Sequence, residues 1–171
     1  VEHVTSILGL IKIRAVPINV NYRYTPTELE YIFTNSDSAA IVVELPEHQQ
    51  VLATLLDRCP LVRAVFVVGD IADELQQAAQ QRSVTVVAFA GAHDLPGTAD
   101  LPARSGDDLY LLYTGGTTGY PKGVMWRHHD FFLKPLSGGN PYGSEPRKDL
   151  AEIAVAAKEF PDLAFLIAAP L

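Results

Sequence analysis

The chain has 171 residues, of which 48% are hydrophobic and 19% are charged, and its formal net charge is −7. This composition is that of a globular protein and excludes a disordered, collagen-like or disulfide-rich chain. The negative charge argues against a broad surface for nucleic acid or anionic lipid, so no nucleic-acid partner is expected. No apolar stretch approaches the roughly 20 residues of a membrane-spanning helix, so no transmembrane segment is expected.

The sequence has one cysteine, Cys59. It cannot form a disulfide within the chain, and no second thiol is available for a structural zinc site. A free thiol fits a reducing compartment, so we expect a cytoplasmic protein with no metal site of its own. We interpret Cys59 as an inert thiol in the core.

The chain begins with an alternation of helical and extended patterns. Apolar residues recur at helical spacing over 4–13, and 15–20 follows as a short strand or extended segment. A helix start comes next, in which Thr25 caps, Pro26 occupies the first turn and Glu28 completes a capping box. This helix is expected to end near Asn35.

Strands are expected at 39–43, 62–68 and 84–90, and helices at 49–58 and 71–82. Strands separated by helices predict an α/β fold with a mostly parallel sheet and helical crossovers. The strands are nearly all apolar, as expected when both faces of the sheet are covered.

The second part of the chain is organised differently. Residues 91–106 are rich in glycine, proline and small side chains, and we interpret them as a linker between a first α/β portion (1–90) and a second portion (107–171). Strands are expected at 109–113, 123–126 and 163–168, and helices near His128 and at 150–158. A Gly/Pro loop is expected at 137–147.

The segment from Tyr113 to Val124 reads Y-T-G-G-T-T-G-Y-P-K-G-V. Its glycines permit backbone angles that other residues resist, and they leave the backbone N–H groups accessible to an anion. Its threonine hydroxyls and Lys122 add hydrogen-bond donors and a positive charge. Donors in this arrangement form a cradle for phosphate, so we predict a phosphate-binding loop.

This loop differs from two common nucleotide-binding motifs. A Walker P-loop has glycine before its lysine and Ser/Thr after it, whereas Pro121 precedes Lys122 and Gly123 follows. The chain also lacks the G-x-G-x-x-G of dinucleotide-binding folds. The stretch 110–134 contains three basic residues, Lys122, Arg127 and Lys134, and one acidic residue, Asp130. The loop region is therefore locally positive.

The loop resembles the phosphate-loop motif of the AMP-forming acyl-CoA synthetases and their adenylating relatives, which usually reads Tyr/Phe-Thr-Ser-Gly-Ser/Thr-Thr-Gly-x-Pro-Lys-Gly-Val. Gly115 stands where most members have serine, which removes a hydroxyl donor and keeps the backbone N–H. The flanking stretches 107–109 and 124–128, and the upstream stretch 17–31, are also similar to the family. The resemblance covers nearly the whole chain and is nearest to bacterial fatty-acyl or sterol-side-chain CoA ligases.

The resemblance implies that 1–171 is part of an N-terminal adenylating domain, cut at both ends. Family members activate a carboxylate with ATP and Mg²⁺ to an acyl-adenylate and pyrophosphate, and then transfer the acyl group to coenzyme A. The carboxylate would be a fatty acid or a sterol side chain. The residues implied to bind the β- and γ-phosphates are Thr114, Gly115, Gly116, Thr117, Thr118, Gly119 and Lys122.

The catalytic lysine of this family belongs to a C-terminal region that this chain does not contain, so Lys122 is not that lysine. We therefore expect no complete turnover from the chain alone, and we expect the remainder of its own domain as its partner. Two other hypotheses stay open. In the first, the chain is a module that binds a nucleotide and catalyses no reaction. In the second, it is a non-functional remnant.

Several residues near the loop have simpler interpretations than catalysis or ligand binding. His128 and His129 are expected to cap and pack a helix, because adjacent residues point to different helix faces. Asp107 and Asp108 are expected to form the solvated start of a strand. Trp126 is expected in the core, and the aromatic stretch 21–24 is expected to pack as a loop.

Overall fold

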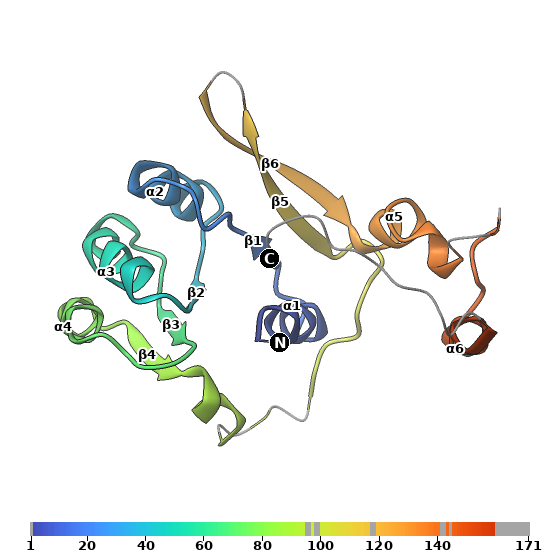
Figure 1. Cartoon of the computed structure of the whole chain (residues 1–171), viewed down its shortest axis with the longest axis horizontal. Coiled ribbons are helices and arrows are strands. Elements are labelled where there is room, and N and C mark those ends of the chain that lie inside the picture. Colours follow the sequence, from blue (N-terminus) through green and yellow to red (C-terminus); the bar gives the residue numbers. More distant parts are fainter. Residues whose placement is uncertain are drawn as a thin grey trace.

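The computed structural model describes residues 2–94, 97, 100–116, 119–140, 143 and 145–159. It contains two three-stranded sheets, with strand orders β2-β3-β4 and β1-β5-β6. Figure 1 shows α2, α3 and α4 lying side by side along the first sheet, and the long β5–β6 hairpin rising between this layer and α5. The strand expected at 163–168 lies outside the described residues.

The first sheet consists of β2 (Ala40–Val43), β3 (Ala64–Val67) and β4 (Thr85–Ala88). All its pairs are parallel, and β3 lies between the other two strands. The crossovers are α3 (Pro46–Leu55), which continues into a 3-10 turn, and α4 (Asp73–Gln81). The predicted parallel sheet with helical crossovers is confirmed.

The core lies between this sheet and its helices. Val65 and Val67 of β3 are fully buried and pack in one cluster with residues of all three helices; those of α2–α4 are Ile32, Phe33, Leu52, Leu55, Leu75 and Ala79. Cys59 belongs to the same cluster, and burial raises the pKa of its thiol, as expected for an inert core cysteine. On the opposite face of the sheet, Val42 is 42% exposed. Both faces were expected to be covered, but among the described residues only the face that carries Val65 and Val67 is fully covered.

Helix α2 (Pro26–Asn35) has the bounds that its sequence predicts. The backbone N–H of Glu28 donates to Thr25 Oγ1 at 3.4 Å, and the backbone N–H of Thr25 donates to Glu28 Oε2 at 2.7 Å. This reciprocal pair is a capping box, and it satisfies donors that a helix start leaves free. The box therefore fixes where α2 begins.

The second sheet is built around a long hairpin that the sequence did not predict. Strand β5 (Leu109–Gly116) and strand β6 (Gly119–Arg127) form an antiparallel hairpin that includes most of the stretch expected to be a loop. The short strand β1 (Ile18–Asn19) pairs with β5 in parallel, so this sheet is mixed. The remaining elements are α1 (Glu2–Lys12), α5 (His128–Leu133), α6 (Leu150–Glu159) and 3-10 turns at Phe89–Asp94 and Ser137–Gly139.

None of the helices in the described part of the chain is long and apolar enough to cross a bilayer.

Candidate functional site

The described residues among those predicted to bind phosphate lie where β5 ends and β6 begins, in the hairpin shown in Figure 1. Thr114 pairs with Lys122, and its hydroxyl donates to the Lys122 carbonyl at 3.5 Å. Gly116 pairs with Gly119. The hairpin thus brings these residues together, whereas Thr117 and Thr118 lie outside the described residues.

The pairing is irregular at this end. The register shifts between Thr114 and Gly116, so that Tyr120 and Pro121 together oppose Gly115. Pro121 has no N–H to give to the ladder, and a bulge is a position where a strand tolerates proline. Gly119 has φ +128°, which other residues rarely adopt. The two strands therefore reach the turn through a distorted segment.

The glycines also leave space at the backbone. An added Cβ at Gly115 or Gly119 would have no heavy atom within 4 Å. Gly115 and Gly119 are exposed, so an anion can approach their backbone from solvent. This geometry suits backbone donors that contact phosphate oxygens.

Lys122 carries the available positive charge of the hairpin. Its side chain is exposed and forms no ion pair within the described part of the chain. Arg127, by contrast, is bound to Asp107 at 3.0 Å and to Asp130 at 2.8 Å, and it holds the pKa of Asp130 below its usual value. The positive window predicted from the sequence is therefore largely neutralised at its base and stays positive at Lys122.

An ion pair joins the base of the hairpin to Arg14, two residues after the end of α1. Arg14 Nε lies 3.0 Å and 3.1 Å from the two carboxylate oxygens of Asp108, and Nη2 lies 2.7 Å from Oδ1. The backbone N–H of Ser105 also donates to Asp108, at 2.9 Å. These bonds lower the pKa of Asp108, and the hydrogen bond from the Arg14 guanidinium has the largest effect.

The expectation of a solvated strand start is therefore wrong for Asp108, whose side chain is 10% exposed, and holds for Asp107, which is 78% exposed. Sequence spacing gave no signal for this pair because Arg14 lies 94 residues away in the chain.

His128 and His129 begin α5. Their backbone N–H groups donate to the carbonyls of Asp108 at 2.8 Å and Gly106 at 3.0 Å, which anchors the helix start. His128 Nε2 is buried and has no hydrogen-bond partner among the described residues. Trp126 was expected in the core, but it is half-buried, lies outside the core cluster of the described residues and meets the edge of Phe131 on α5. The described residues contain no group of three His, Cys, Asp or Glu suited to a metal ion.

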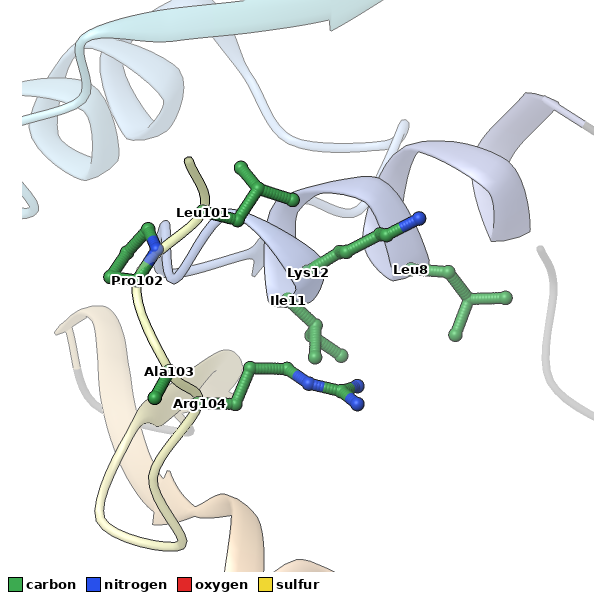
Figure 2. A pocket seen from close by; sticks show the side chains of 7 residues that line it. All are labelled: Leu8, Ile11, Lys12, Leu101, Pro102, Ala103 and Arg104. Carbon is green, nitrogen blue, oxygen red and sulfur yellow. The ribbon is translucent and has the colours of Figure 1, made fainter. Parts of the chain in front are cut away.

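Two hollows lie beside α1, at the base of the hairpin. Figure 2 shows the first, of about 430 Å³, where Leu8, Ile11 and Lys12 of α1 lie beside the segment 101–104. The second, of about 620 Å³, is lined by apolar residues of α1 and α5 together with Tyr110 and His128. The lining of neither includes a predicted phosphate-binding residue, so the exposed end of the hairpin is the better candidate site.

A helix-covered parallel sheet joined to a glycine-rich hairpin with a free lysine defines an α/β domain suited to an anionic ligand. The family profile described as AMP-binding enzyme matches residues 1–149. The chain belongs to this family.

Named relatives agree with this assignment. The chain is 42% identical over 170 residues to a 3-oxocholest-4-en-26-oate–CoA ligase of Rhodococcus rhodochrous, covering 95% of this chain and 28% of that protein. It is 39% identical over 164 residues to a medium/long-chain-fatty-acid–CoA/3-oxocholest-4-en-26-oate–CoA ligase of Mycolicibacterium smegmatis, covering 95% of this chain and 29% of that protein.

The fold also matches a solved structure. The anthranilate CoA ligase AuaEII in complex with anthranoyl-AMP superposes with a TM-score of 0.66 at 24% identity, over 82% of this chain and 26% of that one. The chain thus has the fold of part of an adenylate-forming enzyme, and it spans less than a third of the length of the relatives it matches.

Proposed function

We propose that this chain is the phosphate-binding part of an AMP-forming acyl-CoA ligase. The observation that carries the proposal is the exposed end of the β5–β6 hairpin, where Lys122, which has no ion pair among the described residues, lies beside open glycine backbone. The residues assigned to the β- and γ-phosphates of ATP are Thr114, Gly115, Gly116, Thr117, Thr118, Gly119 and Lys122. Hydroxyl, amide and ammonium donors are the groups that phosphate oxygens require.

The proposed reaction has two steps. A carboxylate oxygen attacks the α-phosphorus of ATP, the bond to the bridging oxygen breaks, and pyrophosphate leaves. The sulfur of coenzyme A then attacks the acyl carbon, and AMP leaves. The hairpin assists the first step because it neutralises the charge that develops on the departing pyrophosphate.

Mg²⁺ belongs to this proposal as a counter-ion of the phosphates. The described residues contain no group of three His, Cys, Asp or Glu suited to a metal ion. Mg²⁺ at a nucleotide is commonly bound by phosphate oxygens, waters and one or two carboxylates, and no carboxylate of this chain is proposed for that role. The residues at the hairpin fit the anionic substrate, and none is assigned to the ion itself.

We propose a fatty acid or a sterol side-chain carboxylate as the acyl substrate. The support is the similarity to two ligases whose names specify such acids. A reducing, cytoplasmic location is proposed on the free and buried thiol of Cys59.

The first test is a binding measurement. We expect Lys122→Ala to weaken the affinity of the chain for ATP roughly tenfold to a hundredfold, because one charge-assisted hydrogen bond contributes about 1.5–3 kcal/mol. Lys134→Ala is the matched control, since it removes one exposed lysine at the end of α5, away from the hairpin tip. Titration calorimetry gives both affinities, and equal affinities in the two variants would refute the assignment of Lys122.

The second measurement separates a ligase part from a simple binding module. The matched region is 28% of the Rhodococcus ligase, so we expect carboxylate-dependent ATP–pyrophosphate exchange to need residues beyond these 171. Exchange is therefore measured on this chain and on a longer chain that contains it, with a panel of fatty acids. If only the longer chain exchanges, the ligase assignment is supported; if both are silent while ATP binds, the binding module is favoured.

A further inference from the structure

The hairpin touches α2 close to the predicted phosphate site. The ring of Tyr31, on α2, stacks on the ring of Tyr120, on β6, with centroids 4.6 Å apart and an angle of 22° between the planes. Tyr120 is two residues before Lys122, and it lies in the irregular segment between Gly119 and Pro121. The stack therefore joins a buried-core helix to the part of the hairpin that carries the lysine.

Two hydrogen bonds support the same junction further down the hairpin. The hydroxyl of Tyr113 donates to Asn35 Oδ1 at 2.7 Å, and the hydroxyl of Tyr24 donates to the carbonyl of Tyr113 at 3.5 Å. Tyr24 precedes the N-cap of α2, and Asn35 is the last residue of the helix. The helix thus contacts β5 at Tyr113 and β6 at Tyr120.

At the end of the hairpin, Tyr120 and Lys122 are exposed, whereas Pro121 between them is fully buried. A two-stranded ribbon is marginally stable on its own in water, and glycines add backbone freedom near its turn. Tyr120 remains 53% exposed, so one face of its ring is available to solvent while the other lies on Tyr31. The stack on Tyr31 and the buried ring of Pro121 therefore both restrict where Lys122 lies relative to the rest of the domain.

We propose that Tyr31 is a positioning residue for phosphate binding: its ring holds Tyr120 and so fixes the place of Lys122 and the neighbouring backbone donors. This inference rests on the proposed function of the hairpin. It assigns to Tyr31 no contact with the nucleotide. Its effect concerns the β- and γ-phosphates, because these are the groups that the hairpin end is proposed to bind.

The test compares ligands that differ in these phosphates. We expect Tyr31→Ala to weaken binding of ATP and of pyrophosphate about threefold to tenfold, the range that an aromatic pair supplies, and to leave AMP binding unchanged. Tyr31→Phe keeps the stack and is expected to bind like the parent chain, since the Tyr31 hydroxyl has no hydrogen-bond partner among the described residues. Tyr22→Ala is the matched control, because its ring contacts Arg23 in the loop before α2.

A double-mutant cycle checks that the stack itself is responsible. Tyr120→Ala is expected to weaken ATP binding as Tyr31→Ala does, and the double variant is expected to be no weaker than either single one. Because Tyr120 is exposed, its variant tests the stack even if Tyr31→Ala lowers the yield of folded protein.

The outcomes separate the two proposals. If the parent chain binds neither ATP nor pyrophosphate, the proposed function fails and this inference fails with it. If the parent binds ATP and Tyr31→Ala binds it equally well, the function stands and the positioning role is refuted. Loss of AMP and ATP binding in equal measure would also refute it, because that pattern indicates general damage to the fold.

Discussion

The ion pair between Arg14 and Asp108 links the segment after α1 to the residue before β5. Arg14 lies in the left-handed region, at φ 60°, where a residue other than glycine is uncommon. Its guanidinium contacts both oxygens of Asp108, and such two-point contacts restrict geometry more than a single bond does. The pair therefore holds the first residues of β5 in a defined place.

The contribution of this pair to stability depends on pH. Arg14 and the Ser105 amide lower the pKa of Asp108 in the folded chain, below the value of about 3.9 for an unfolded aspartate. The folded state therefore gains stability from the ionised carboxylate above that unfolded value, and it loses this gain as the pH falls through the lowered pKa. His128 lies near the carboxylate, and its charge acts in the same direction.

We expect Asp108→Asn to lower the melting temperature at pH 7. The difference from the parent chain is expected to shrink as the pH falls below about 4, where the unfolded chain takes up a proton, and through the lowered pKa of the folded carboxyl. Thermal melts followed by circular dichroism between pH 7 and pH 3 measure this. Asp107→Asn is the control, because its carboxylate is 78% exposed and exposed ion pairs contribute little. A difference for Asp108→Asn that stays constant with pH would contradict the assignment.

At the scale of elements, the hairpin depends on a small residue where its strands face each other. Gly123 pairs directly with Tyr113, and an added Cβ would lie 3.2 Å from Tyr113 Cζ and 3.5 Å from Leu111 Cδ1. The Tyr113 ring is 9% exposed and bonded to Asn35, so it has little freedom to move away. Glycine is thus required at this position by packing.

Gly123→Ala is expected to lower the free energy of unfolding by about 1–3 kcal/mol, the usual effect of overpacking. Gly115→Ala is expected to change it by less than about 0.5 kcal/mol, because an added Cβ there meets nothing within 4 Å. Urea unfolding followed by Trp126 fluorescence compares the two variants. If Gly115→Ala proved as damaging as Gly123→Ala, packing against Tyr113 would not be the reason for the glycine.

The elements differ in how far the sequence predicts them. The bounds of α2 follow from Thr25, Glu28 and the periodicity after them, because a capping box is a local signal. The strands predicted at 109–113 and 123–126 lie within β5 and β6. Their extension toward the turn and their pairing were not predicted, because glycine and threonine favour loops locally, whereas the pairing of β5 with β6 decides the structure. The contacts of Tyr31 and of Arg14 were also missed, since both depend on residues distant in the chain. The division into 1–90, a linker at 91–106 and 107–171 stays a prediction.

At the scale of the whole molecule, buried side chains gather in the first sheet. Of the residues in the core cluster, Tyr113 comes from the second sheet, and the others come from the first sheet, its helices and the turns that join them. Pro121 of β6 is also fully buried. Gln49 joins α3 to the start of α4, because its amide donates to the Asp70 carbonyl at 3.0 Å and accepts from the Ala72 N–H at 2.9 Å. On the hairpin, in contrast, the side chain of Met125 is 70% exposed.

This uneven burial predicts uneven protection from hydrogen exchange. The amides of β3 should exchange slowest, because β3 is paired on both sides and its Val65 and Val67 are fully buried, so its amides open mainly with the core. The amides of β6 should exchange sooner, since among the described strands β6 pairs with β5 alone.

Leu55→Ala provides the test. Leu55 is fully buried in the core cluster, and its truncation is expected to cost about 2–5 kcal/mol, which speeds exchange in β3 roughly thirtyfold or more. Exchange of the β6 amides should change little, because local opening of the hairpin does not require the core to unfold. Mass-spectrometric exchange on the parent and variant chains measures both segments. Equal acceleration in β3 and β6 would show that the hairpin opens only together with the core, and that the two sheets form one cooperative unit.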